Sequence, residues 1–284
     1  MNIFERIEKI DRRIIFLLVA IAVLLPLIFK VRMEIPISEP VKKAFVSVDT
    51  LSSGTYILIS VDYDPASMPE LQPMYKTLLM QCFEKGLKPV MIVQWPLGLP
   101  LSIKAMSEMA VEYNRIASKE GKDTVVYGVD YCNIGYRPGG VAQIVGIGKE
   151  IRDYFESDYK GTPLDSLPMM KDIHNYDNFA LLFCLEAGSM GEMYVQYANA
   201  RFGIKIIFGM TAVSAPDAYP YLQSGQIIGL LGGLQGAAEY ETLMKKPGFA
   251  TMGMTAQSWV HVLIVLFILL GNIGYFIGRK KRRS

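Results

Sequence analysis

Acidic side chains follow three of the strands that the sequence predicts. The ones placed to act together are Asp62, Asp64, Asp130 and Glu186. In an open α/β sheet, ligands bind outside the carboxyl ends of the strands, so these four carboxylates could converge there and bind a divalent cation through oxygen ligands. The alternative is that each of them caps the next helix or turn, or stays solvated. The sequence therefore requires no cofactor, and it leaves a divalent metal at these four carboxylates open.

Other residue types that carry chemistry are sparse. His261 falls in an apolar segment and His174 in a polar loop, so no Ser-His-Asp or Cys-His set can be built. The cysteines Cys82, Cys132 and Cys184 lie in apolar surroundings without metal-ligand spacing, which indicates small buried hydrophobic residues. The glycines after residue 134 do not form Gly-x-Gly-x-x-Gly, and no Gly-Lys-Ser/Thr occurs, so nucleotide phosphate binding is not indicated.

Short apolar runs alternate with amphipathic segments through the middle of the chain. The runs at 56–61, 89–93, 124–129, 179–185 and 204–208 predict strands, and 69–85, 102–118 and 190–201 predict helices, with a further helix after 138–140. Strands that are apolar throughout predict a parallel sheet with helices on both faces. We expect residues 55–250 to form a doubly wound, Rossmann-like, three-layer α/β domain. Residues 31–54 carry prolines and charges, so we expect a linker or edge segment there.

Apolar residues run without a charge from Ile14 to Phe29 and from Ser258 to Gly278, so segments 14–30 and 258–278 predict transmembrane helices. A signal peptide is disfavoured for the first, because the residues after it, 30–34, offer no small-x-small cleavage site. Basic residues flank the spans in segments 1–13 and 279–284. The positive-inside rule then places both termini in the cytoplasm and the domain outside it, in a two-pass protein of the plasma membrane. The lipid bilayer is therefore one expected partner.

Glycines are concentrated in residues 224–241 and recur in the second apolar segment. Their spacing predicts a tightly packed helix that something approaches closely, either the rest of the domain or another subunit. In the apolar segment, the last two are spaced as Gly-x-x-x-Gly, which permits close helix contact in lipid. We therefore expect a homo-oligomer or other membrane subunits as partners. The predicted contact glycines are Gly225, Gly229, Gly232, Gly233, Gly236, Gly274 and Gly278.

The predicted layout resembles that of membrane-tethered von Willebrand factor A domains. The metal site of that family begins with Asp-x-Ser-x-Ser after the first strand, and this chain has Asp62-Tyr63-Asp64-Pro65-Ala66-Ser67 there. Only Asp62 matches in position, and both serines of the motif are missing. The resemblance is therefore one of layout, and it implies no activity for this chain.

The composition excludes one further class of function, nucleic-acid binding, and leaves three. The net charge is +2, and no Lys/Arg run with interleaved aromatic residues occurs between 44 and 240, which argues against nucleic-acid binding. We expect a non-catalytic scaffold or subunit of a prokaryotic membrane protein complex. One alternative is a divalent-metal-dependent hydrolase that uses the four carboxylates. Another is a small-solute binding module with Trp95, Tyr131 and Tyr136 as walls of its crevice.

Overall fold

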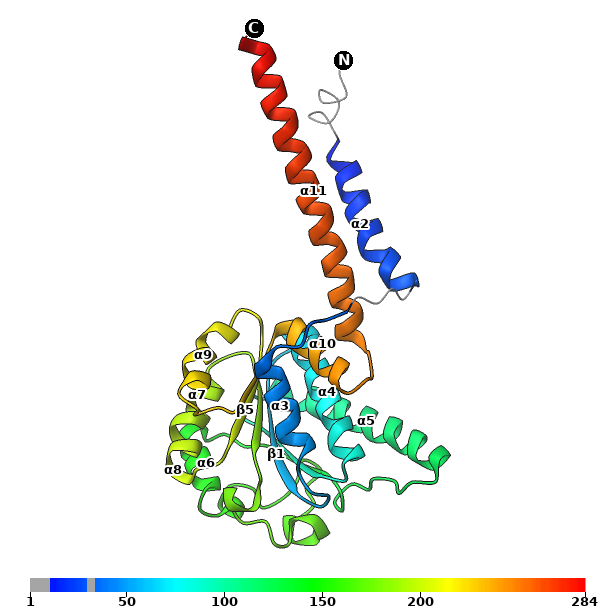
Figure 1. Cartoon of the computed structure of the whole chain (residues 1–284). Helices are drawn as coiled ribbons and strands as arrows, with labels where there is room; N and C mark the ends of the chain where they lie inside the picture. Colours follow the sequence, from blue (N-terminus) through cyan, green and yellow to red (C-terminus); the bar gives the residue numbers. More distant parts are fainter. Residues whose placement is uncertain (1–10, 30–33, 284) are drawn as a thin grey trace. The chain divides into compact units, whose positions relative to one another are not determined.

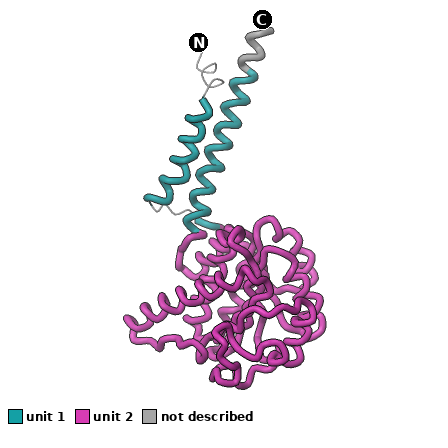
Figure 2. Tube along the Cα trace, turned by 180° about the vertical axis from the view of Figure 1, so that it is seen from behind, with its two compact units in different colours: residues 1–35, 251–284 teal, residues 36–250 magenta. Residues whose placement is uncertain are grey.

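A computed structural model describes residues 11–29 and 34–283 of the chain, with side chains up to residue 276. The chain divides into two compact units, of which one holds residues 36–250 and the other holds residues 1–35 and 251–284 (Figure 2). Sequence predictions that involve residues 1–10, 30–33 and 284, and the side chain environments of 277–283, lie outside the described part. The first unit corresponds closely to the predicted α/β domain, and it begins about twenty residues earlier.

The domain is built on a six-stranded sheet in which every pair of neighbouring strands is parallel (Figure 1). Its strands are buried along most of their length, which is the pattern of a sheet covered on both faces. The strand order is β3-β2-β1-β4-β5-β6. The strands are β1 (Tyr56–Asp62), β2 (Lys88–Val93), β3 (Cys132–Tyr136), β4 (Leu182–Glu186), β5 (Ile206–Met210) and β6 (Gly229–Gly232).

Helices cover the two faces of the sheet, so the predicted α/β class is confirmed. Four helices pack together on one face, namely α3 (Glu39–Asp49), α4 (Met68–Glu84), α5 (Gly98–Glu120) and α10 (Gly233–Leu243). The other face packs into one apolar cluster with α6 (Gly140–Ile147), α7 (Met190–Tyr194), the π-helical turn Val195–Asn199 and α9 (Ala215–Gln223). The short α8 (Ala200–Phe202) directly follows the π-helical turn. The connection from α6 to β4 contains 3-10 turns at Ile151–Asp153, Leu164–Ser166, Pro168–Met170 and Tyr176–Asn178.

The segment expected to be a linker or edge strand contains helix α3. Val41, Ala44 and Val48 recur at helical spacing and are buried, so the helix has an apolar face that packs on the domain. Ser38, at the start of the helix, donates from both its backbone N and its Oγ to Glu239 of α10, at 2.8 and 2.5 Å. The prolines and charges of this segment obscured its short helical period in the sequence.

The predicted strand at 124–129 is also wrong, and the third strand instead begins at Cys132. Asn114 of α5 binds Val125 in both directions, with its amide Nδ2 donating to the carbonyl O at 2.9 Å and its Oδ1 accepting from the N–H at 2.7 Å. Gly128 has a φ of +82°, which breaks an extended run. These contacts tie the apolar residues to α5 and not to β2.

The glycine-rich segment is a strand followed by a helix, and not the single helix predicted. Gly229 lies in β6, where an added Cβ would be 2.7 Å from the Cα of Ala44 in α3. Gly236 of α10 lies as closely over Leu231, so the expected close approach is present inside the domain. Gly232 and Gly233 pack against Ala215 and Ala212, whereas Gly225, with a φ of +77°, forms an open turn.

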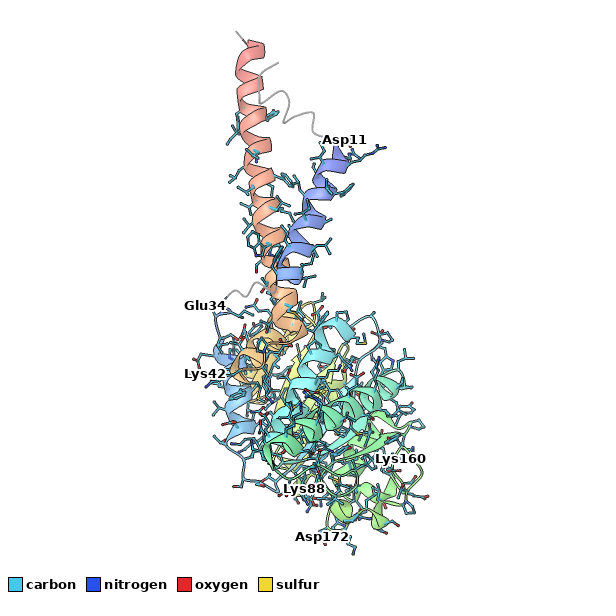
Figure 3. The ribbon with its side chains drawn as sticks, turned by 90° about the vertical axis from the view of Figure 1, so that its right-hand side faces the viewer. Asp11, Glu34, Lys42, Lys88, Lys160 and Asp172 are labelled. Carbon is cyan, nitrogen blue, oxygen red and sulfur yellow. The ribbon has the colours of Figure 1, made fainter. Side chains whose placement is uncertain are left out.

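The second unit contains two apolar helices, α2 (Arg12–Phe29) and most of α11 (Phe249–Arg283). Both are long and apolar enough to span a membrane, since an 18-residue helix covers about 27 Å. Asp11 precedes α2, and its Oδ1 accepts from the N–H of Arg13 at 2.9 Å (Figure 3). Gly274 and Gly278 both lie in α11, and the surroundings of Gly278 fall outside the described side chains.

Candidate functional site

The strand order reverses between β1 and β4, the two central strands. From β1 the chain moves outward through β2 to β3, and it then returns to add β4, β5 and β6 on the other side. The connections therefore diverge at the carboxyl ends of β1 and β4, which is where parallel α/β sheets open a crevice. Asp62 and Glu186, the last residues of these two strands, are register partners there. The fold thus brings together two of the four carboxylates that the sequence singled out.

Asp62 is fully buried and well supplied with hydrogen-bond donors. Its Oδ1 accepts from the backbone N–H of Gln94 at 2.6 Å, and its Oδ2 accepts from the Oγ of Ser60 at 2.5 Å. The Ser60 Oγ also contacts the hydroxyl of Tyr194 at 2.9 Å, and the Nε2 of Gln94 donates to that same hydroxyl at 3.2 Å. Burial raises the pKa of Asp62 to about 6, and the bonds from Ser60, Gln94 and Trp95 limit the rise.

Glu186 is equally buried, but only one of its two carboxylate oxygens has a hydrogen-bond donor among the described residues. Its Oε2 accepts from the N–H of Gly191 at 2.6 Å, while its buried Oε1 has no hydrogen-bond partner in the described part of the chain. Burial, and then the negative charge of Asp62 and Glu192, raise the pKa of Glu186 to about 8. The Glu186 side chain is therefore mostly protonated at neutral pH, whereas most Asp62 side chains are ionised.

The loops that follow β4 and β2 come close together at the carboxyl edge. A Cβ added to Gly188, in the loop after β4, would lie 3.8 Å from the ring of Trp95 in the loop after β2. Beside Glu186 there remains a cavity of about 50 Å³ between the end of β4, α7 and α9. This space suits a few water molecules or a small group, and it is too small for a nucleotide or a sugar.

The other two predicted metal ligands do not join this pair. Asp64 accepts from the N–H and the Oγ of Ser67, both at 3.1 Å, and so fixes the turn before α4. Asp130 precedes β3 and therefore lies at the amino edge of the sheet, where its Oδ2 accepts from the N–H of Val126 at 2.8 Å. No group of three or more His, Cys, Asp or Glu side chains in the described residues is placed to hold a metal ion. The four-carboxylate cluster is thus not assembled.

The expected aromatic walls are also divided between the two edges. Trp95 follows β2 and Tyr136 is the last residue of β3, both at the carboxyl edge, but Tyr131 precedes β3. Tyr131 is buried and packs edge to face on Tyr127, with their ring centroids 5.5 Å apart. Cys82, Cys132 and Cys184 are buried and unpaired, and burial raises the pKa of each thiol. They are buried, as the sequence predicted.

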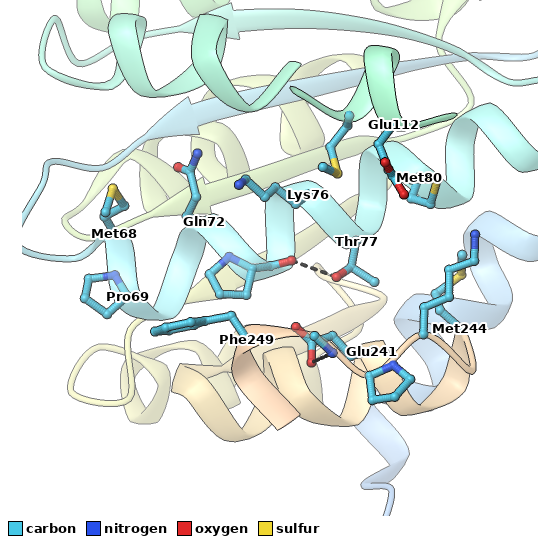
Figure 4. A pocket seen from close by; sticks show the side chains of 15 residues that line it. Met68, Pro69, Gln72, Lys76, Thr77, Met80, Glu112, Glu241, Met244 and Phe249 are labelled. Atoms are coloured by element: carbon cyan, nitrogen blue, oxygen red, sulfur yellow. Dashed lines mark hydrogen bonds between the residues drawn. The ribbon is translucent and has the colours of Figure 1, made fainter. Parts of the chain in front are cut away.

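A much larger cavity lies on the helical layer that holds α4, α5 and α10. Its volume is about 550 Å³, and it is lined largely by methionine, proline and phenylalanine (Figure 4). Met80, Met244 and Phe249 come from α4, the end of α10 and the start of α11, and Figure 4 shows them around the same hollow. We call this cavity the methionine groove; its lining also includes Met68, Pro69, Gln72, Pro73, Lys76, Thr77, Met109, Glu112, Glu241, Lys246, Pro247 and Gly248.

The charged residues of the methionine groove already have partners within the domain. Lys76 Nζ lies 2.5 Å from an Oε of Glu108, and Glu112 lies 2.7 Å from the guanidinium of Arg115. Lys246 pairs with Glu84. Glu241 accepts from the N–H groups of Gly248 and Ala250, at 2.8 and 3.0 Å, and so holds the loop that closes one side. The apolar surface is therefore what the groove offers to a ligand.

Comparison of the chain with protein families, with curated proteins and with solved structures gives no match. We therefore infer the function from the geometry of the domain. Sequence reasoning missed Ser60, Tyr194 and the methionine groove. A signal for Ser60 was present, because Ser60 and Asp62 are the polar residues of one face of an otherwise apolar strand. The groove had no comparable signal, since its lining comes from three segments that are far apart in the sequence, 68–80, 109–112 and 241–249.

Proposed function

We propose that this chain is a two-pass membrane protein whose Rossmann-like domain acts outside the cytoplasm as a non-catalytic subunit, and that it holds a partner subunit in the methionine groove. The strand order 3-2-1-4-5-6 supports the Rossmann-like class. The single observation that carries the function is the groove itself. It has a volume of about 550 Å³ and a mainly apolar lining.

The occupant we infer is an amphipathic helix of a partner membrane protein. Unbranched methionine side chains adapt their shape to an inserted apolar face, as in other grooves that bind helices. The rim charges Lys76, Glu112 and Lys246 are each neutralised by a neighbour, so the groove has little to offer a phosphate headgroup. A second copy of this chain or a lipid acyl chain would be separate outcomes of the test.

The two apolar helices support the anchoring. Most large apolar side chains of α2 and of α11 from residue 259 to 276 are exposed, which suits contact with lipid better than a place in a protein core. The basic residues before Ile14 and after Gly278 support cytoplasmic termini by the positive-inside rule. The metal-hydrolase alternative has less support, because only Asp62 and Glu186 of its four ligands meet.

A matched pair of substitutions on α5 tests the groove. Met109 lines it, while Val111 is two residues away, 70% exposed and not part of the lining. We expect Met109→Glu to release the partner, because a carboxylate placed in the apolar contact must be desolvated. The full chain, extracted gently from membranes of its native host, should then migrate on a native gel at the mass of the chain alone. Val111→Glu should migrate with the wild type.

Native mass spectrometry of the wild-type complex identifies the occupant. A protein of different mass supports the proposal, and a complex made only of this chain or of chain plus lipid contradicts the partner-subunit assignment. If both glutamate variants keep the full complex, the groove is not the contact surface. Retention of the wild-type melting temperature by Met109→Glu serves as the control for folding.

A further inference from the structure

We propose that the cavity beside Glu186 binds a small cationic group, the ammonium of a primary amine. This site is separate from the methionine groove and does not depend on the function proposed for it. Three carboxylates from three elements border the cavity: Glu186 at the end of β4, Glu192 in α7 and Asp217 in α9. The remaining lining is Gly188, Phe208, Met210, Ser214, Ala218 and Tyr221, so lysine and arginine do not contribute to it.

The need for a ligand comes from Glu186. Glu192 and Asp217 are exposed and lie in the first turns of their helices, where acidic residues stabilise the helix dipole without any ligand. Glu186 has 0% exposure, and its Oε1 is an acceptor with no partner in the described structure. A buried acceptor left unpaired is costly, and an N–H donor placed in the adjoining cavity would satisfy it.

The walls favour an ammonium group over a metal ion. Phe208 and Tyr221 contribute aromatic rings, whose faces attract ammonium ions. The hydroxyl of Ser214 offers one further acceptor. The described residues hold no set of three metal-ligating side chains at coordinating positions, so a divalent cation would lack ligands. The volume of about 50 Å³ admits the head of an amine and excludes a bulky quaternary group.

Binding should depend on pH through Glu186. The charged or titratable groups near its carboxyl are Asp62 on β1, Cys184 on β4 and Glu192 on α7, and Asp217 and Tyr221 of α9 border the same cavity. Burial and the negative charges of Asp62 and Glu192 hold Glu186 protonated up to about pH 8. An ammonium ion binds the ionised carboxylate, so affinity should rise as the pH passes from 6.5 to 8.5.

The test uses the full chain in detergent and methylammonium chloride as the probe. Isothermal titration calorimetry should show binding that is about tenfold or more tighter at pH 8.5 than at pH 6.5, because Glu186 must lose its proton first. Tetramethylammonium, which cannot donate a hydrogen bond, and MgCl₂ should not bind. Glu186→Gln should abolish binding, and Glu120→Gln, which alters an exposed carboxylate far from the cavity, should leave it unchanged.

Asp217→Asn provides a second variant that does not disturb the buried core, since Asp217 is exposed. We expect it to weaken methylammonium severalfold while the melting temperature stays at the wild-type value. The proposal is overturned if methylammonium fails to bind at either pH, if Mg²⁺ binds in its place, or if Glu186→Gln and Asp217→Asn both retain wild-type affinity.

Discussion

The carboxyl edge of the sheet and the methionine groove are packed in opposite ways, the first around buried polar groups and the second around an open apolar cavity. At the edge, Ser60, Asp62, Gln94 and Tyr194 form a closed hydrogen-bond network, and only about 50 Å³ of space remains beside Glu186. In the groove, about 550 Å³ is bordered mainly by side chains without polar atoms. The edge depends on fixed positions of donors and acceptors, whereas the groove depends on side chains that can rearrange.

Because of this difference, we expect the two regions to respond differently to substitution and to pH. A buried polar network is sensitive to any lost partner, because a donor or acceptor left unpaired pays its full desolvation cost. Methionine surfaces tolerate substitution, because the unbranched side chain fills irregular gaps in several conformations. We therefore expect the edge to respond to pH and to single-atom changes, and the groove to respond mainly to charge.

The largest expected effect is that of Glu186→Gln on the pH dependence of stability. The pKa of Glu186 is raised from its ordinary 4.5 to about 8, so the folded state holds a proton that the unfolded chain releases. The stabilisation from this proton is complete below pH 4.5 and is lost as the pH rises towards 8. A tenfold change in proton affinity is worth about 1.4 kcal/mol, so the wild type should lose several kcal/mol over this range.

Urea unfolding of the full chain in detergent measures this loss. Trp259→Phe leaves Trp95, which lies close to Gly188, as the only tryptophan reporter, since the sequence has two. The Glu186→Gln variant should show a much flatter stability profile between pH 5 and pH 8.5, and Glu120→Gln should keep the wild-type slope. Equal slopes for wild type and Glu186→Gln would show that Glu186 ionises normally and that the edge is less closed than the structure indicates.

Ser60→Ala should have the next largest effect, and it tests the network around Asp62. The change removes the 2.5 Å bond to Asp62 and the 2.9 Å contact with the Tyr194 hydroxyl. The expected loss of stability is roughly 1–3 kcal/mol, the usual cost of leaving a buried acceptor unpaired. Because the bond lowers the pKa of Asp62 below what burial alone would give, the loss should be larger at pH 8 than at pH 5.

The same unfolding assay checks this prediction, with Ser107→Ala on the exposed face of α5 as its control. A loss that is the same at both pH values would mean that Ser60 supports packing alone and does not stabilise the ionised carboxylate. Both serines lose one oxygen, so the comparison isolates the effect of burial.

Local sequence pattern sufficed for the parts of the fold whose period is undisturbed. Strands β1, β2, β4 and β5 and helices α4 and α5 follow the predicted runs, and Gly121 ends α5 in the left-handed conformation. Two of the failures, at 124–129 and in the glycine-rich segment, share one cause, which is that tertiary contacts override local preference. Asn114 removes 124–129 from the sheet, and the close approach of Ala44 to Gly229 makes a strand from glycines that read as a helix.

The candidate sites also divide into those that the sequence predicted and those that it did not. The rule that ligands bind at strand ends found Asp62 and Glu186, because each follows a strand that was correctly predicted. Asp130 was misplaced because its strand was misplaced. The methionine groove combines α4, α5, α10 and the residues before Phe249, and no spacing in the sequence indicates that these segments meet. A site built by long-range helix packing is therefore beyond pattern reading.

The smallest expected effect is that of Met109→Leu in the groove. Leucine has nearly the volume of methionine, and such exchanges cost less than about 1.5 kcal/mol even in packed cores. Met109 is only half-buried and borders an open cavity, so we expect a change in unfolding free energy near the limit of detection. Phe208→Leu beside the Glu186 cavity is the matched exchange at the edge, where the ring is 1% exposed and contacts Gly191 closely. A larger loss of unfolding free energy for Phe208→Leu than for Met109→Leu supports the division into a fixed and an adaptable region. Equal losses would mean that the methionines pack as an ordinary rigid core, and there would then be no reason to regard them as a contact surface.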